Sequence, residues 1–173
     1  MKKIIFLIVH LGGWLSACAA DKPFSVLIVP EKRSETDSSI GWGSGSAHGF
    51  FVLLTNLTDK NQPVFEAWNS WGYQAIAFEM ILSDGRKANL TVKERNFTKN
   101  VASVYVIPPH GHQVFPVTLG DEWQGKPDLG PAGTTKVTLK AIYEVAPTKE
   151  SREQGVWTGR VESVPAEVYV RHW

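Results

Sequence analysis

The amino-acid sequence predicts an all-β domain built as an antiparallel β-sandwich, and three observations support this prediction. Apolar and polar residues alternate with a period of two through much of the chain, which is typical of strands with one buried face. The apolar spacing of an amphipathic helix hardly occurs. Turn-forming residues separate the alternating segments, so about nine short strands are expected.

Five of these strands lie in the first half of the chain. Residues 49–56 (GFFVLLTN) are apolar at nearly every position, as expected of a strand covered on both faces. Ile76, Phe78 and Leu82 share one face of the next regular segment, and Asp84-Gly85 is a strong hairpin signal after it. The expected strands are residues 24–30, 49–56, 64–68, 74–82 and 87–93.

Four further strands are expected in the second half. The segment KVTLKAIYEV alternates most regularly and places Val137, Leu139 and Tyr143 on one face. The last segment places Val164, Val168 and Val170 together. The expected strands are residues 101–107, 113–119, 136–145 and 164–171. The long connections, on which binding residues commonly lie, are residues 31–48, 120–135 and 146–157.

The first twenty residues have the layout of a secretory signal peptide. Lys2 and Lys3 form a positive region, a mostly apolar run follows, and small residues come next. Two cleavage positions are open. A cut at an A-x-A-like site would remove Cys18, which is the only cysteine in the sequence, and would release a soluble protein.

The second position rests on a resemblance. Residues 15–18 (LSAC) resemble the lipobox of bacterial lipoproteins, in which an aliphatic residue and two small residues precede a cysteine. The resemblance implies cleavage before Cys18 and acylation of this residue, which would anchor the protein in a membrane. Ala19 after the cysteine implies the outer membrane, facing the periplasm or the exterior. The chain then divides into a signal peptide (1–17), a lipidated cysteine with a short tether (18–23) and one domain (24–173).

Charge and cysteine content exclude some classes of partner and fold stabilisation. The sequence has 18 Lys and Arg residues against 17 Asp and Glu residues, so no basic surplus points to nucleic acid. A lipidated Cys18 leaves no thiol for a disulfide, and the fold must then be held by apolar burial alone.

The body of the chain resembles the immunoglobulin-like domains of secreted bacterial proteins. The resemblance is carried by residues 63–86, by IPPHGHQVFPVTL, by VTLKAIYEV, and by GVWTGRVESVPAEVYV, which contains a W-x-G-x-x-x-S pattern followed by alternating valines. It implies an immunoglobulin-like antiparallel β-sandwich and is almost silent on activity. The chain departs from the usual turn at His110, where proline is common.

Aromatic residues are the leading candidates for ligand binding. Trp68, Trp71 and Tyr73 cluster between two expected strands, and Trp123 lies in a long loop. Exposed rings in a row could stack on sugars or form a hot spot for a protein partner. Alternatively, the rings plug the open ends of a sandwich that has no disulfide, since each buried ring contributes several kcal/mol.

A metal site is a weak candidate, and no metal or other cofactor is expected. His110 and His112 are two residues apart in an extended segment, so their side chains can point to the same side. His48 and His172 could complete such a site. The alternative is a solvated turn chosen for its backbone geometry.

The sequence therefore predicts a protein that is not an enzyme. It would be a membrane-anchored extracytoplasmic lipoprotein whose β-sandwich binds, or associates structurally with, an unknown envelope protein or glycan. One alternative is a secreted carbohydrate-binding module that uses exposed tryptophans. Another is a small domain that resembles a protease inhibitor, with residues 120–135 as its loop.

Overall fold

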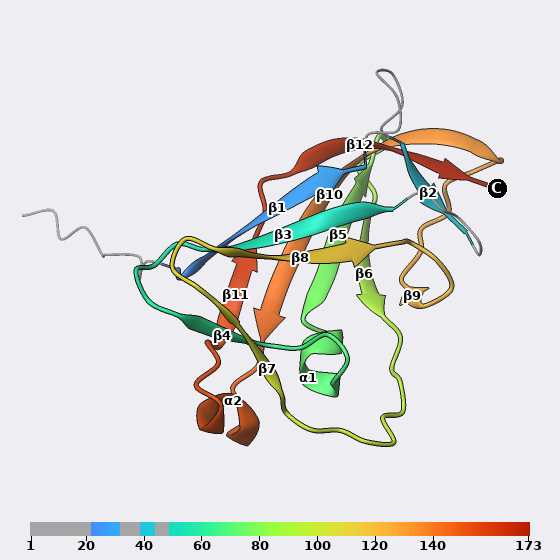
Figure 1. Cartoon of the computed structure of the whole chain (residues 1–173). Coiled ribbons are helices and arrows are strands. Elements are labelled where there is room, and N and C mark those ends of the chain that lie inside the picture. Colours follow the sequence, from blue (N-terminus) through green and yellow to red (C-terminus); the bar gives the residue numbers. More distant parts are fainter. Residues whose placement is uncertain (1–21, 32–38, 44–48) are drawn as a thin grey trace, which may run out of the picture.

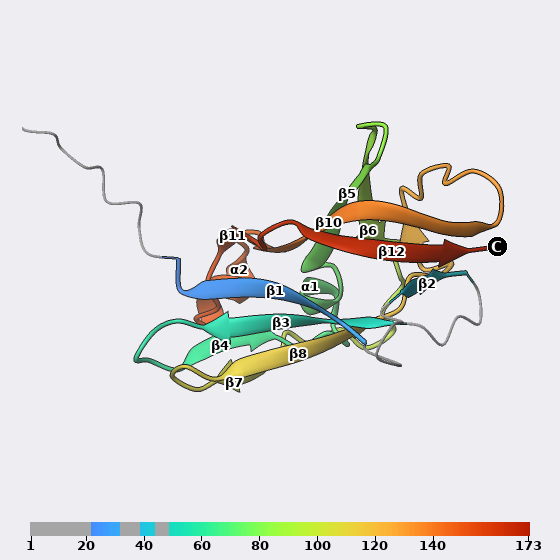
Figure 2. The same cartoon turned by 90° about the horizontal axis from the view of Figure 1, so that it is seen from above.

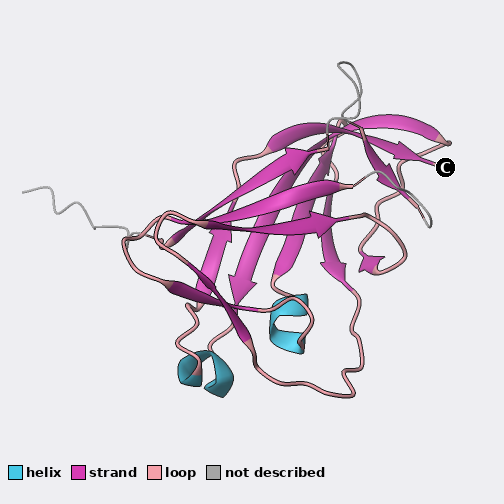
Figure 3. Cartoon of the chain, viewed as in Figure 1, coloured by secondary structure: helices cyan, strands magenta, loops and turns pink. Residues whose placement is uncertain are grey.

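The computed structural model describes residues 22–31, 39–43 and 49–173, and these ranges are mostly β-structure (Figure 1). Within them the only helices are the short α1 (Ser70–Tyr73) and α2 (Lys149–Glu153), which lie at one end of the strands (Figure 3). The strands are β1 (Phe24–Pro30), β2 (Ile40–Trp42), β3 (Phe50–Asn56), β4 (Gln62–Phe65), β5 (Ile76–Leu82), β6 (Lys87–Val92), β7 (Val104–Ile107), β8 (His112–Val117), β9 (Trp123–Gln124), β10 (Gly133–Val145), β11 (Gly159–Glu162) and β12 (Ala166–His172). The prediction of an all-β domain is confirmed at this level.

The strands form two unequal layers (Figure 2). One layer is a curled sheet with the strand order β2-β12-β10-β5-β6-β9, in which β11 also pairs with β10. The other contains a sheet of only three strands, in the order β1-β3-β8, and a separate two-stranded sheet of β4 and β7. Within the described ranges, the pairing of β2 with β12 is the only parallel one between named strands.

The apolar positions of the alternating segments face the space between the layers, as predicted. Phe78, Met80, Leu90 and Leu139 are completely buried, because the strands that carry them lie in the middle of the larger sheet. Val164 is an exception. It was expected to share the buried face of the last strand but is 72% exposed, since β12 begins only at Ala166.

Three short strands that the sequence did not reveal lie in or directly after the expected loops. β2 lies within residues 31–48, β9 lies within residues 120–135, and β11 follows the loop that contains α2. Segments of two to four residues carry too little alternation to be recognised. The strand expected over residues 64–68 ends at Phe65, because α1 begins shortly afterwards.

The W-x-G-x-x-x-S pattern has a structural explanation. The ring of Trp157 packs edge-on against Phe24 at 5.7 Å. Gly159 has a φ of 142°, and a β-carbon at this position would lie 2.6 Å from that indole ring, so only glycine fits. The hydroxyl of Ser163 accepts the backbone N–H of Ala141 at 2.9 Å. Ser163 thereby supplies a hydrogen-bond partner for the backbone of β10 at the point where the strand paired with β10 changes from β11 to β12.

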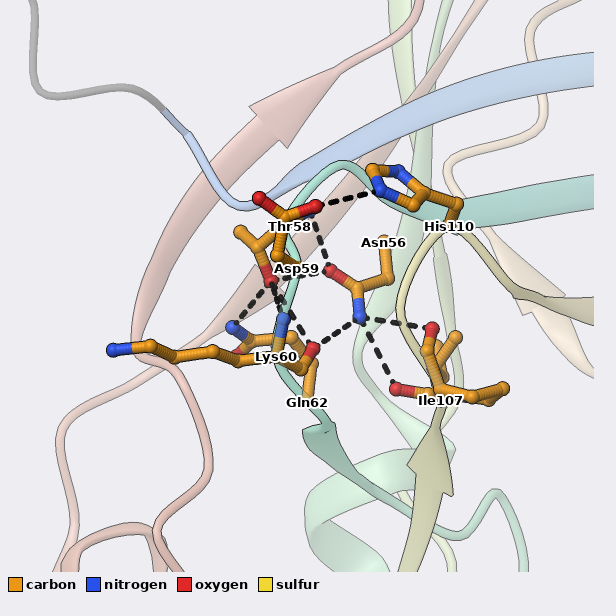
Figure 4. Close-up of polar contacts among 8 residues, drawn as sticks. Asn56, Thr58, Asp59, Lys60, Gln62, Ile107 and His110 are labelled. Atoms are coloured by element: carbon orange, nitrogen blue, oxygen red, sulfur yellow. Dashed lines mark hydrogen bonds and ion pairs between the residues drawn. The ribbon is translucent and has the colours of Figure 1, made fainter.

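A buried asparagine forms the corner between the two smaller sheets (Figure 4). Asn56 is completely buried at the end of β3. Its amide donates to the carbonyls of Lys60, Ile107 and Pro108 at 2.7, 3.2 and 3.0 Å. Its side-chain oxygen accepts the N–H and the hydroxyl of Thr58 at 2.9 and 2.8 Å. These bonds stand where the ladder between β3 and β8 ends and the ladder between β4 and β7 begins.

The outer face of the larger sheet is charged. Lys140 contacts Glu79 and Glu162 at 3.2 and 3.0 Å, and Arg160 contacts Glu144 and Glu162, each at 2.9 Å. Hydrogen bonds from Lys140 and then from Arg160 lower the pKa of Glu162. Such a network favours contact with water on this side of the molecule.

The outer face of the β1-β3-β8 sheet is apolar. Leu27, Val29, Phe51 and Val114 are 37–48% exposed on it, in two adjacent rows across the strands. No Asp, Glu, Lys or Arg points outward from these three strands, all of which the structure describes. The expectation that residues 49–56 are covered on both faces is therefore wrong for the described chain, because only the inner face of β3 is buried. Uncharged apolar surface of this kind commonly marks an interaction site.

We expect the substitution Asn56→Ala to lower the free energy of unfolding by about 2–4 kcal/mol, because it leaves buried carbonyl groups without a donor. Urea denaturation followed by circular dichroism measures this loss. Asn96→Ala is the matched control at an exposed position, and its effect should stay within about 0.5 kcal/mol. Equal effects of the two substitutions would contradict the role assigned to Asn56.

Candidate functional site

Two adjoining cavities form a groove beside β8. The first has a volume of about 200 Å³ and is walled by Tyr73, Trp123 and the segment of β8 from Phe115 onward, with Glu122 at its border. The second has a volume of about 270 Å³ and lies between β4, β7 and β8, with Trp68 in its wall. Ala67 and Phe115 line both cavities, so the two cavities are neighbours, and together they are called the groove.

The edge of β8 beside this groove has no partner strand in the described part of the chain. The N–H of Asn56 donates to Gly111 at 2.9 Å, so the backbone groups of Gly111 and of alternate residues after it face β3. The backbone groups of His112, Val114 and Pro116 consequently face the open side.

Three features protect this open edge from unspecific pairing. Pro116 has no N–H to offer. The side-chain amide of Gln113 donates to the carbonyl of Val114 at 3.2 Å. The indole N–H of Trp123 donates to the carbonyl of Thr118 at 2.9 Å, just beyond the end of the strand. Among the described residues, the N–H groups of His112 and Val114 therefore have no partner on this edge, and the rest of the edge is partly covered.

The four predicted aromatic residues do not form one flat row. Trp123 is 9% exposed and packs on Phe78 at 5.2 Å, and Tyr73 is half-buried at the other wall of the first cavity. Trp71 stacks on Phe65 at 5.9 Å and opens to a separate cavity of about 440 Å³. Of the four, only Trp68 is mainly exposed, at 51%. The rings thus line cavities and core rather than a platform for stacking sugars.

Polar contacts hold the wall of the groove opposite β8. Asn69 is completely buried, caps α1 by accepting the N–H of Gly72 at 3.0 Å, and donates to the carbonyl of Ser103 at 2.9 Å. Glu66 accepts hydrogen bonds from the hydroxyl of Ser103 and from the indole N–H of Trp68. These two bonds, the one from Ser103 first, lower the pKa of Glu66. Glu66 is therefore a fixed negative charge at neutral pH.

The charged residues of the groove are all acidic. Among the described residues that line the two cavities, Glu66 and Glu122 are the only charged ones, and each borders a different cavity. The remaining lining is apolar or aromatic, with a few neutral polar groups. This arrangement suits a ligand with an apolar body and neutral or positive ends.

The two histidines of the expected turn do not converge. His110 has a φ of 56°, the left-handed conformation that the Pro108–Gly111 turn requires, and its Nε2 lies 2.9 Å from the carboxylate of Asp59. His112 points outward from β8. His172 is buried, with Nε2 at 2.9 Å from the hydroxyl of Thr135. No group of three His, Cys, Asp or Glu residues in the described ranges could hold a metal ion.

Several sequence predictions fall on residues outside the described ranges. These are the signal peptide, Cys18 and His48, the remaining histidine of the weak metal candidate. In the described part of the chain, no helix is long and apolar enough to cross a membrane. Residues 120–135, the loop expected for a protease inhibitor, are held at their start by Trp123 and by the pairing of β9 with β6.

Sequence reasoning missed three residues of the groove. Glu66, Gln113 and Phe115 looked like ordinary members of their strands, because nothing local shows that the two strands meet at a corner. One signal was present. Pro116 within a predicted strand indicates an edge position, and this alone could have identified β8 as the open edge.

No protein-family model matches this chain, and no curated protein sequence matches it either. The evidence for function therefore comes from the groove and from the sequence motifs.

Replacing the two tryptophans at opposite ends of the groove should have very different effects on stability. We expect Trp123→Ala to cost about 3–5 kcal/mol, because a buried ring and its hydrogen bond are lost. Trp68→Ala should cost less than about 1 kcal/mol, because half of the ring is already in water. Urea titrations of both variants measure this contrast. A loss of stability for Trp68→Ala as large as that for Trp123→Ala would contradict the exposure assigned to Trp68.

Proposed function

We propose that this chain is a lipid-anchored lipoprotein of the bacterial cell envelope whose β domain acts by non-covalent binding at the groove beside β8. The anchoring part rests on the resemblance of residues 15–18 to a lipobox. The binding part rests on one observation. In the described part of the chain, a strand edge without a partner strand lies directly beside two adjoining apolar cavities, with aromatic rings and two carboxylates in their walls.

The state of Glu66 supports binding over catalysis. A general acid at neutral pH needs a pKa raised towards 7, whereas hydrogen bonds from Ser103 and Trp68 lower the pKa of this carboxyl. A carboxylate held in this way serves recognition of a positive or hydrogen-bonding group.

We also propose that the two layers are a variant of the immunoglobulin-like sandwich. The antiparallel order β1-β3-β8 opposite β10-β5-β6 supports this, as does the packing of Trp157, Gly159 and Ser163 in the pattern that carries the resemblance. In this arrangement the edge of β8 is the outer edge of the smaller sheet.

The anchor is tested by the substitution Cys18→Ser. The unchanged protein should incorporate labelled palmitate and partition into the detergent phase of Triton X-114, and the variant should do neither. The substitution Ser16→Thr is a matched control, which leaves the cysteine in place. Unchanged processing and membrane fractionation of Cys18→Ser would reject the lipoprotein assignment.

The binding function is tested by placing a photoreactive benzoylphenylalanine at Ala67, the exposed residue that lines both cavities. Irradiation of cells that produce the protein should give a discrete crosslinked adduct. The same group at the exposed Gln154, beside α2, should give none. Absence of an adduct from Ala67, or equal adducts from both positions, would contradict binding at the groove.

A further inference from the structure

We propose that the free edge of β8 binds an extended segment of a partner protein, which adds an antiparallel strand to the β1-β3-β8 sheet. The inference rests on the proposed binding function and names the partner class for the same groove. The segment would carry alternating apolar side chains and basic residues at its ends.

The backbone of β8 offers the groups that an added strand needs. The N–H and C=O of His112, the N–H of Val114 and the carbonyl of Pro116 face the open side, and the Gln113 amide can release the carbonyl of Val114. Every pairing already present in this sheet is antiparallel. An added strand continues the same pattern, and main-chain bonds of this kind supply affinity in strand-addition complexes.

The two cavities lie where the side chains of an added strand would enter. Phe115 and Val117 point inward from β8, and Phe115 separates the two cavities. Inward side chains of an added strand occur at every second residue, about 7 Å apart, so successive ones would fill the two cavities. Each cavity is smaller than the roughly 300 Å³ at the lower end of small-molecule sites, which favours side chains over a compact ligand.

The unequal layers leave room for such a strand. The β1-β3-β8 sheet has three strands, opposite a path of six in the other layer. Val92 at the end of β6 and Trp123 in β9 line the first cavity together with Phe115 and Val117 of β8. The outward side chains of an added strand would extend the apolar face next to Val114.

The negative charge of the groove favours a different protein as the partner, rather than a second copy of this chain. Glu66 and Glu122 border the cavities, so a segment with basic ends is attracted. Two copies paired through β8 would bring these carboxylates of both chains together. Pro116 would also remove an N–H from each strand of such a pair.

The test uses the full chain in detergent solution and a fluorescently labelled peptide, Lys-Thr-Val-Thr-Val-Thr-Lys, with both termini capped, in which the lysines share the inward face with the valines. Fluorescence anisotropy should show saturable binding. The same peptide with glutamate in place of both lysines should bind at least tenfold more weakly, because it meets Glu66 and Glu122 with like charge. Equal binding of the two peptides, or no binding by either, would overturn the proposal.

Methylation of peptide nitrogens tests the strand geometry. In an antiparallel pair, residues opposite each other share a face, so valines that point inward place the N–H groups of the three threonines towards β8. Methylating the threonine nitrogens should weaken binding about tenfold or more, whereas methylating the two valine nitrogens should change it less than threefold. The reverse order, or no effect of either, would overturn antiparallel strand addition.

A variant of the protein gives the same test from the other side. Val114→Pro removes an N–H from the open edge without touching the ladder to β3, and should weaken peptide binding about tenfold. Val114→Thr keeps the N–H and should bind like the original chain. Circular dichroism and thermal unfolding test whether both variants fold. If Val114→Pro does not fold, the methylated peptides alone decide whether the added strand pairs with β8.

Failure here is distinguishable from failure of the proposed function. A crosslinked adduct at Ala67 without peptide binding would reject strand addition and leave binding at the groove standing. A stable dimer of the unliganded chain by light scattering, abolished by Val114→Pro, would assign the edge to a second copy and overturn the proposal.

Discussion

The corner at Asn56 is the constraint on which the groove depends. Its buried amide group makes the bonds that the ladder between β3 and β8 would otherwise continue. The paired strands can therefore turn away and continue as β4 and β7 without leaving buried polar groups unpaired. This turn carries β4 and the segment with Glu66 and Ala67 to the open side of β8. A straight ribbon would leave the edge of β8 without an opposite wall.

The two outer faces differ in their chemistry. The larger sheet presents a network around Lys140, Arg160 and Glu162, which is suited to water. The smaller sheet presents uncharged apolar side chains, and its last strand is open at the edge. Together these features place the surface that favours association on the β1-β3-β8 side, where the chain also leads back to the proposed anchor at Cys18. A binding domain held close to a membrane would expose the charged side to the solvent.

The sequence predicted what depends on alternation and missed what depends on distant contacts. The inward rows of β5 and β10 follow from a period of two, and the turn at Asp84-Gly85 follows from its residue types, with Gly85 at a φ of 85°. The corner does not follow, because Asn56 meets Ile107 only when the strands pair. The sequence left open whether Trp123 is exposed for ligand binding or buried in the structure. The packing of its ring on Phe78 decides for burial. Strands as short as β2 and β9 exist because longer neighbours hold them.

Hydrogen exchange along β8 in the unliganded chain tests the central claim most directly, since that claim is an edge left free beside the groove. Exchange measured by NMR should alternate along the strand. The N–H groups of Gln113, Phe115 and Val117, which face β3, should exchange slowly, and those of His112 and Val114 should exchange at least a hundredfold faster. Protection of Val114 equal to that of Phe115 would mean that the edge is already paired, and the account of the groove would be wrong.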